Sequence, residues 1–182
     1  LQAFSNFNLK IEQIKKKLKL PKETIVIFGK DCKRKEIWRN ELYPDYKKSR
    51  KENNEVGEFF KYTYENIISK YTYIDNDKCE ADDIIGVLTK ELYKNNKIYI
   101  ITGDHDYLQL LFNDNVQIFN MKFKNLRDKS CGNNENDLML KILMGDSSDN
   151  IFPIHKKLGP KTAMKYIDNP ELLLKKCEDT EI

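Results

Sequence analysis

The sequence predicts an α/β fold, in which a mostly parallel central sheet is flanked by helices and followed by a helical C-terminal part. Two observations predict this arrangement. Short apolar runs, typical of buried parallel strands, alternate with segments of helical apolar spacing. From about residue 136 onward only helical patterns and turns remain. The 182 residues contain no apolar run of membrane-spanning length, so we expect no membrane partner.

The expected elements follow one another in this alternating order. Residues 7–18 have helical apolar spacing, and Thr24–Phe28 is an apolar strand that Gly29 is expected to break. A basic segment at 33–50 precedes a helix over 55–70. The later predictions are strands at Tyr71–Ile74, Lys97–Thr102 and Val116–Met121, helices at Ala81–Tyr93 and Tyr107–Leu111, and turns at Gly145–Asp149 and Gly159–Pro160. A loop near 125–136 divides the α/β core, residues 1–135, from a helical region, residues 136–182.

Charge is nearly balanced at +3 but is segregated along the chain. From Lys30 to Lys51 nine basic residues accompany four acidic ones, and residues 150–167 carry four lysines and no acid. Basic stretches separated by acidic clusters favour a polyanionic substrate handled by bound cations. A solvated, lysine-rich surface explains the charge runs equally well.

The cysteines and histidines exclude several classes of site. The four cysteines are far apart and two histidines accompany them, so a structural zinc site is not expected. Reduced thiols indicate a cytosol-like compartment, cytoplasmic or nuclear, and not a secreted protein. No Gly-rich phosphate loop or dinucleotide-binding motif is present.

Carboxylates gather where predicted strands end. One follows the first strand, three open the helix at Ala81, two follow the strand ending at Thr102, and two lie on the turn near Gly145. The eight candidates are Asp31, Glu80, Asp82, Asp83, Asp104, Asp106, Asp146 and Asp149. Because the carboxyl ends of parallel strands meet at one edge of a sheet, we expect these side chains to share a crevice.

Oxygen-only ligands select hard cations such as Mg²⁺ or Mn²⁺. Two such ions about 3.5–4 Å apart activate water and stabilise a leaving oxygen in phosphodiester hydrolysis. Each cluster also has a structural interpretation, since acidic residues cap helices and stabilise turns. The recurrence of all four clusters in one chain favours the metal interpretation.

Four ordered motifs resemble those of the 5′-nuclease family, which includes flap endonucleases, the 5′-exonuclease domain of DNA polymerase I, and phage exonucleases and RNase H. They are E-A-D-D at Glu80–Asp83, T-G-D-H-D-Y-L-Q-L at Thr102–Leu110, G-D-S-S-D-N-I at Gly145–Ile151, and W-R-N-E-L-Y-P-D-Y-K-K-S-R at Trp38–Arg50. The resemblance runs from about Ile25 to Lys165. It implies a PIN-like nuclease core, a helical arch at 33–50, and a C-terminal helix–three-turn–helix.

The resemblance also implies roles for individual residues. The eight carboxylates would hold two Mg²⁺ ions, for which Mn²⁺ would substitute. Lys47 and Arg50 would face the scissile phosphate as catalytic cations, and Tyr46 would stack on a base or pack against the substrate. The duplex backbone would be bound by Lys156, Lys157, Gly159, Lys161 and Thr162. A K⁺ site would accompany that turn, although Phe152–Gly159 retains only the last glycine of the family pattern.

The resemblance implies a 5′→3′ exonuclease or flap endonuclease that acts on branched, nicked or 5′-flapped duplex DNA in replication or repair. RNA–DNA hybrid is a further expected substrate, replication proteins are candidate partners, and the protein is expected to be a monomer. The family's first strand carries an Asp that we do not find before Asp31, and members of the family usually continue beyond the helical motif. Both ends of the sequence are therefore expected to be incomplete. The alternative is therefore a catalytically impaired, structure-selective DNA-binding module. An RNA-cleaving PIN-type nuclease is a third candidate, against which the arch and the Gly145–Ile151 turn count.

Overall fold

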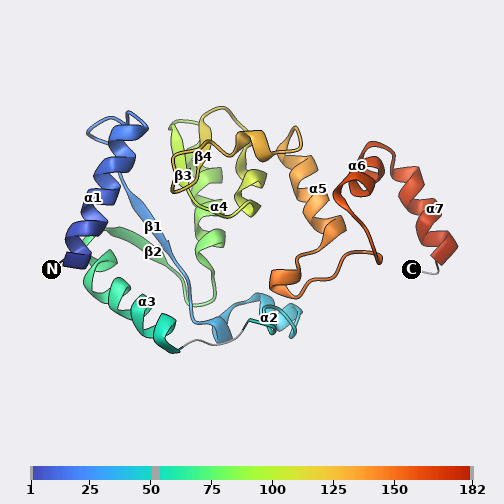
Figure 1. Ribbon diagram of the computed structural model, residues 1–182, viewed down its shortest axis with the longest axis horizontal. Helices are drawn as coiled ribbons and strands as arrows, with labels where there is room; N and C mark the ends of the chain where they lie inside the picture. The colour runs from blue at the N-terminus through green and yellow to red at the C-terminus, as the bar shows by residue number, and fades with distance from the viewer. Residues whose placement is uncertain (1, 51–53, 181–182) are drawn as a thin grey trace.

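The computed structural model describes residues 2–50 and 54–180 and has strands and helices in the predicted alternating order. Figure 1 shows the elements along an elongated molecule, with the two termini at opposite ends. The helices are α1 (Gln2–Lys17), α2 (Arg39–Leu42), α3 (Asn54–Asn66), α4 (Ala81–Leu92), α5 (Asn134–Met144), α6 (Pro160–Asp168) and α7 (Pro170–Thr180). The strands are β1 (Ile27–Lys30), β2 (Thr72–Asp75), β3 (Ile98–Ile101) and β4 (Val116–Phe119).

The strands are parallel, which confirms the predicted α/β class. β1 pairs with β2, with Ile27 opposite Thr72, and β3 pairs with β4, with Ile98 opposite Val116. The sequence predicted one central sheet. In the described residues the four strands instead form two separate two-stranded sheets. Helix α4 joins the pairs by packing: its first turns contact β1, and Ile85 packs against the core around β3 and β4.

The first strand begins three residues later than predicted. Ile25 is 76% exposed, so the start of the apolar run Thr24–Phe28 is not buried in a sheet. Gly29, predicted to break the strand, lies inside it. A Cβ atom at Gly29 would lie 3.0 Å from the carbonyl oxygen of Ala81 and 3.2 Å from Cγ1 of Ile85. The glycine therefore lets the start of α4 approach the strand closely.

The main hydrophobic core lies around β3 and β4. Val116 and Ile118 of β4 are 0% exposed, and Leu108, Leu111 and Leu126 pack around them from the connecting segments. This core supports the loop that leaves β3, because the 3₁₀ turn Asp106–Leu110 contributes Tyr107 and Leu108 to it. Burial of that turn fixes the position of Asp104, just before it, and of Asp106 at its start.

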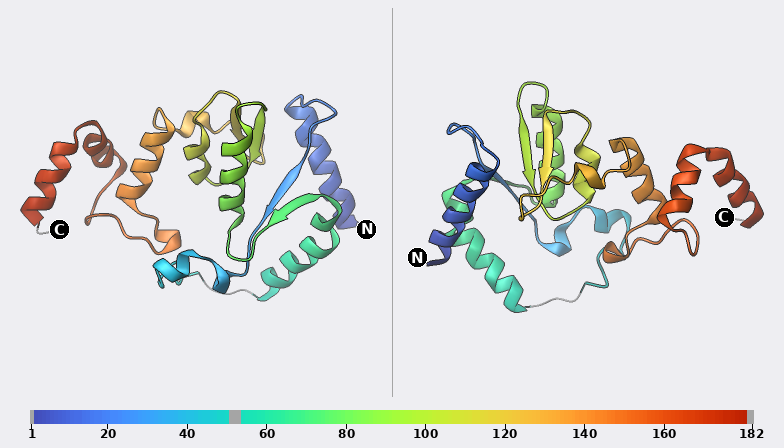
Figure 2. Two further views of the ribbon diagram at one scale, coloured as in Figure 1. Left: turned by 180° about the vertical axis from the view of Figure 1, so that it is seen from behind. Right: turned by 45° about the horizontal axis from the view of Figure 1, so that its top comes forward.

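Helices α5, α6 and α7 follow the core, as the sequence predicted for the region after residue 136. A second cluster of buried residues, Leu143, Leu158 and Ala163, joins α5 to α6. Figure 2 shows from behind that these helices extend away from the β1–β2 pair. None of the helices in the described ranges 2–50 and 54–180 is long and apolar enough to span a membrane.

The segment 33–50 is less helical than the predicted arch. It contains a 3₁₀ turn at Arg34–Glu36, the four-residue helix α2, and turns from Pro44 onward. Pro44 has no N–H to donate to a helix, and Lys47 adopts a positive φ of 55°. Both features stop a helix from continuing through the Tyr46–Arg50 motif.

Replacing Ile118 with alanine should destabilise the fold by about 2 to 5 kcal/mol, because it leaves a cavity in a fully buried site. Urea denaturation followed by circular dichroism measures the loss. Ile25→Ala is the matched control at an exposed isoleucine, and its effect should stay within about 0.5 kcal/mol. Equal effects of the two substitutions would contradict this placement of the core.

Candidate active site

Seven of the eight predicted carboxylates line one cavity of about 370 Å³. They come from segments far apart in the sequence: the end of β1, the start of α4, the loop after β3, and the turn after α5. The seven are Asp31, Glu80, Asp82, Asp104, Asp106, Asp146 and Asp149. The cavity also includes Lys47 and Arg50, which the sequence predicted to be catalytic. Tertiary structure therefore brings the acidic clusters and the basic motif together, as expected.

Local structure holds the acids at the start of α4 in place. Glu80 is the N-cap of α4 and forms a capping box with Asp83, in which each side chain accepts from the other's backbone N–H. Asp31, just after β1, accepts a 2.7 Å hydrogen bond from the N–H of Ala81. These contacts join the end of β1 to the first turn of the helix. Carboxylates there are favoured by the unpaired N–H groups and the helix dipole.

Asp83 differs from the other seven because it does not line this cavity. Its two oxygens accept hydrogen bonds of 2.8 and 2.7 Å from the guanidinium of Arg39, and Trp38 donates to it at 3.3 Å. Burial raises the pKa of Asp83, but the hydrogen bonds from Arg39 and the backbone of Glu80 outweigh burial and lower it. In this structure Asp83 therefore anchors the start of α2, and its predicted role as a metal ligand stays a prediction.

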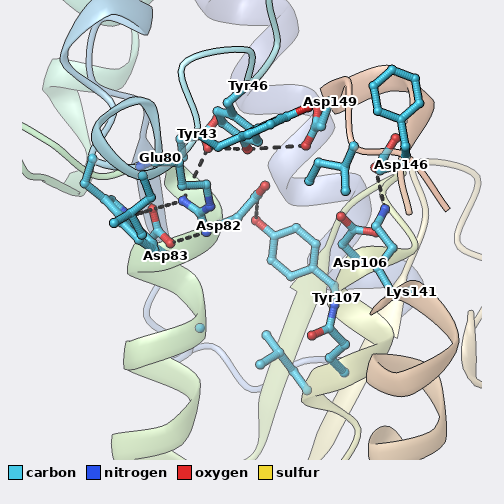
Figure 3. A pocket seen from close by; sticks show the side chains of 18 residues that line it. Tyr43, Tyr46, Glu80, Asp82, Asp83, Asp106, Tyr107, Lys141, Asp146 and Asp149 are labelled. Atoms are coloured by element: carbon cyan, nitrogen blue, oxygen red, sulfur yellow. Dashed lines mark hydrogen bonds and ion pairs between the residues drawn. The ribbon is translucent and has the colours of Figure 1, made fainter. Parts of the chain in front are cut away.

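Asp82 lies beside three other carboxylates and a buried tyrosine. The hydroxyl of Tyr107 donates to Asp82 at 2.5 Å (Figure 3). Partial burial raises the pKa of Asp82, and repulsion from Asp104, Asp31 and Glu80 adds to the rise, while the Tyr107 hydrogen bond opposes it. Such crowding makes a bound cation favourable at this point.

Basic side chains form ion pairs with several acids of the cavity. Lys47 forms an ion pair with Glu80, and Arg50 pairs with Asp149. Lys141 of α5 bridges two acids, at 2.6 Å from Asp106 and 2.5 Å from Asp146 (Figure 3). The sequence interpretation did not include Lys141. The available signal was a single lysine inside the apolar run Leu138–Met144, directly before an acidic turn.

Segment 43–50 is hydrogen-bonded to the turn that carries Asp146 and Asp149. The N–H of Lys47 donates to the Asp149 carbonyl at 2.9 Å, and the Tyr43 hydroxyl donates to the Asn150 carbonyl at 2.9 Å. The Asn150 side chain donates to the Asp45 carbonyl at 3.1 Å. Tyr43 and Asn150 were also absent from the predicted site. Their partners lie more than 100 residues away, so no local pattern reveals them.

Tyr46, predicted to stack on a base, is 8% exposed. Its hydroxyl donates to Glu80 at 2.8 Å, and lies 3.3 Å from Asp149. Burial and these carboxylates raise the pKa of the Tyr46 phenol. In this structure the Tyr46 hydroxyl contacts Glu80 and Asp149, and contact of Tyr46 with substrate stays a prediction.

The cavity lining fits divalent cations chemically, because it offers carboxylate oxygens without histidine and with one peripheral thiol, Cys32. Within residues 2–50 and 54–180, however, no three acidic, cysteine or histidine side chains converge closely enough to hold an ion as they lie. Their oxygens face Lys47, Arg50, Lys141 and Tyr107 instead.

The predicted duplex-binding residues lie around the start of α6, apart from the acidic cavity. Gly159 is the N-cap of α6 and Pro160 occupies its first turn, an arrangement that leaves backbone N–H groups available to an anion. The side chains of Lys156, Lys157, Lys161 and Thr162 are exposed. Their contact with DNA and the associated K⁺ site stay predictions.

Comparisons with known proteins agree with this geometry. The profile of the family described as 5'-3' exonuclease, N-terminal resolvase-like domain, matches residues 1–136. A 5'-3' exonuclease of Buchnera aphidicola is 34% identical over 167 residues, which cover 87% of this chain and 57% of that protein. Ribonuclease H of Enterobacteria phage T4 is 33% identical over 147 residues, which cover 75% of this chain and 48% of that protein.

Among solved structures, the T5 D15 protein co-crystallised with metal ions superposes with a TM-score of 0.71 at 25% identity, over 90% of this chain and 67% of that one. The chain belongs to the 5'-3' exonuclease family, through its N-terminal resolvase-like domain. It spans about half the length of the two curated relatives described above.

Replacing Lys141 with methionine should destabilise the protein in EDTA by about 1 to 2 kcal/mol, because Asp106 and Asp146 lose their shared cation. Adding Mg²⁺ should reduce the difference in stability between the Lys141→Met and wild-type proteins, since a bound cation then balances the charge of Asp106 and Asp146. Thermal denaturation with and without Mg²⁺ measures both effects. Lys90→Met, at an exposed lysine of α4, is the control and should change stability little. A Lys141→Met protein as stable as the wild type in EDTA would refute the bridging role.

Stability of the metal-free protein should fall in acid over a defined range. Burial raises the pKa of Asp146, but hydrogen bonds from Lys141 and Ser148 outweigh it and lower the pKa to about 2. The unfolded value is about 3.9, so the stabilisation is fully present above pH 3.9 and is lost as pH falls through about 2. Urea unfolding between pH 5 and 2 should show this loss. The Lys141→Met protein should show a smaller loss, and parallel curves would contradict the assignment.

Proposed function

We propose that the protein is a metal-dependent 5′→3′ exonuclease or structure-specific 5′-flap endonuclease that hydrolyses DNA phosphodiesters. The observation that carries the proposal is the shared cavity of seven carboxylates, Lys47 and Arg50. Acidic oxygens suit divalent cations, and cations beside them suit a phosphate. The names of the relatives, 5'-3' exonuclease and ribonuclease H, support the same chemistry.

The proposed ligands of two Mg²⁺ ions are the carboxylates of the cavity, with Asp83 as a more distant member. When bound, the ions supply Lewis-acid stabilisation of the charge that develops during hydrolysis, and Mn²⁺ is expected to substitute. The co-crystallisation of the T5 D15 protein with metal ions supports a divalent cofactor.

Lys47 and Arg50 bind the scissile phosphate in this proposal. Both are now paired with acids, Lys47 with Glu80 and Arg50 with Asp149. With divalent cations held by those acids, Lys47 and Arg50 would be free to face the negatively charged phosphate. Their positive charges would stabilise the additional negative charge of the transition state. Lys141 would likewise be free of Asp106 and Asp146.

The substrate is proposed to be branched, nicked or 5′-flapped duplex DNA, with an RNA–DNA hybrid as a further substrate. The exposed lysines near the start of α6, Lys156, Lys157 and Lys161, would contact the duplex backbone with Gly159 and Thr162. We also propose that the protein is a monomer and works beside replication proteins. Its compartment is then the cytoplasm of a bacterial or virus-infected cell, or a nucleus.

The second candidate is a structure-selective DNA-binding module without turnover. The exposed lysines Lys156, Lys157 and Lys161 support it, because they lie outside the acidic cavity and would contact the DNA backbone without a metal ion. Turnover and DNA binding measured on one sample separate the two candidates. Binding with no cleavage in Mg²⁺ or Mn²⁺ would favour the module.

Replacing both Asp104 and Asp106 with asparagine should reduce cleavage of a 5′-flapped duplex in Mg²⁺ by at least about 100-fold, because the cavity loses two anionic ligands. Single-turnover assays of labelled DNA, with EDTA as a blank, measure the rate. Asp114→Asn is the matched control, since that side chain is fully exposed and lies outside the cavity. Cleavage that survives EDTA or the double substitution would refute the mechanism.

A further inference from the structure

The turn that leads into α6 contains one of the two histidines of the chain, His155. This turn connects the acidic turn after α5 to Gly159 at the start of α6 (Figure 1). His155 is half-buried, and its ring meets the ring of Tyr166, on α6, edge-on at a centroid distance of 5.8 Å. Neither the predicted metal ligands nor the predicted duplex-binding residues include this pair.

Both ring nitrogens of His155 have a partner. Nδ1 lies 3.0 Å from the carbonyl oxygen of Lys156, and Nε2 lies 3.2 Å from the hydroxyl oxygen of Tyr166. A carbonyl oxygen only accepts hydrogen bonds, so Nδ1 carries a hydrogen. In the neutral imidazole Nε2 then has none, and it accepts the hydrogen bond of the Tyr166 hydroxyl.

Protonation of His155 reverses the second of these hydrogen bonds. A proton from solvent binds the lone pair of Nε2, and Nε2–H then donates to the oxygen of Tyr166. The O–H bond of Tyr166 stays intact, but its hydrogen turns away from the ring and is available to another acceptor. The turn gains one positive charge in the same step. A phosphate oxygen is an acceptor that is favoured by both changes.

Hydrophobic packing holds the two residues in position. Tyr166 and Ile154 pack against a buried cluster formed by Leu143 of α5, Leu158 of the turn and Ala163 of α6. The N–H of Ile154, directly before His155, donates to the carbonyl of Leu143 at 3.0 Å. The backbone beside His155 and the ring of Tyr166 therefore belong to one packed unit.

The charged groups nearest in sequence are positive. Residues 150–167 contain four lysines and no acidic residue, and Lys156 and Lys157 are exposed beside His155. Both hydrogen-bond partners of His155 are uncharged groups, so protonation adds to the charge of the lysines. The other titratable side chains on the helices packed here are Glu135, Asp137 and Lys141 of α5, Lys161, Lys165 and Asp168 of α6, and Glu171, Lys175, Lys176, Cys177 and Glu178 of α7.

The same turn is a poor fit to the K⁺ ion that the resemblance implies. K⁺ is bound where several carbonyl oxygens replace its hydration shell. The carbonyl of Gly159 accepts from the N–H groups of Thr162 and Ala163, at 3.0 Å each, and the carbonyl of Lys156 accepts from His155. Because donors of the protein already occupy these oxygens, positive charge at this turn is better supplied by a side chain.

We propose that protonated His155 and the hydroxyl of Tyr166 form a phosphate-binding pair, which takes the place of a K⁺ ion at this turn. The ligand is a phosphodiester of the duplex, and the inference rests on the proposed binding of duplex DNA beside α6. Tyr166 contacts the phosphate oxygen through its O–H. His155 is the positioning residue, because its protonation releases that hydrogen and adds the charge. Duplex binding therefore strengthens as the pH falls and histidine becomes protonated.

The pH dependence of duplex binding tests the pair. The full chain in EDTA is titrated with a labelled duplex at pH 8 and at pH 6, at constant ionic strength, and binding is followed by fluorescence anisotropy. Wild-type affinity should be about five-fold or more higher at pH 6, since one contact to a charged phosphate is added. The plot of log affinity against log salt concentration should be steeper at pH 6 by about one. Equal affinities and slopes at the two pH values would overturn the proposal.

Three substitutions assign the effect to individual side chains. His155→Gln, which stays neutral, should bind like the wild type at pH 8 and gain nothing at pH 6. Tyr166→Phe keeps the packed ring and should retain only part of the gain, because the imidazolium charge remains. His105→Gln removes the other histidine, which lies outside the turn, and is the matched control that should respond like the wild type. A pH response that persists in His155→Gln, or is lost in His105→Gln, would overturn the proposal, and thermal denaturation at both pH values identifies any loss of folding.

A change of salt tests the replacement of K⁺. Duplex binding at pH 6 is compared in equal concentrations of potassium chloride, sodium chloride and tetramethylammonium chloride, whose cation is too large for a carbonyl cage. The affinities should agree within about two-fold, since screening depends on ionic strength. Binding that is about five-fold or more tighter in potassium chloride alone would show a K⁺ site and contradict the inference.

Cleavage of a 5′-flapped duplex in Mg²⁺ is measured separately, so that this inference and the proposed function can fail independently. Duplex binding with the expected pH response but without cleavage would support the pair and reject the nuclease. Cleavage together with duplex binding that His155→Gln leaves unchanged at both pH values would reject the pair and retain the nuclease. Absence of duplex binding at either pH would reject the pair together with the proposed contact beside α6.

Discussion

Electrostatic repulsion in one small cavity is the constraint on which the rest of the structure depends. Seven carboxylates converge there, and like charges so close together repel one another. The protein offsets this repulsion with cations from distant segments, Lys47 and Arg50 on one side and Lys141 on the other. Segment 33–50 and helix α5 are therefore held to the α/β core by the same charges that suit it to bind cations.

The backbone supports that arrangement at points of close approach. Gly29 allows the start of α4 to lie against β1. Gly145 has a φ of 65°, and a Cβ atom there would lie 2.5 Å from the carbonyl carbon of Phe152. The second glycine therefore closes the turn that carries Asp146 and Asp149. The close contacts at Gly145 leave no room for a Cβ atom, and those at Gly29 leave little.

A larger cleft of about 730 Å³ lies beside the acidic cavity, and the two spaces share a wall of five carboxylates. Arg39 belongs to this boundary, since it pairs with Asp83 and also stacks on Trp38. Asp83 therefore also positions Arg39 against Trp38, while its role as a metal ligand stays a prediction.

The sequence by itself determined the α/β class, the parallel strands and the convergence of most of the acids, because strand periodicity and strand ends are local features. Lys47 and Arg50, which the resemblance to the nuclease family implied, line the same cavity. Tertiary structure alone decided the two separate strand pairs, the short helix in place of a helical arch, and the partners of each acid. Arg39 meets Asp83 across 44 residues and Tyr43 meets Asn150 across 107, and such long-range pairings leave no periodic signal in a single sequence.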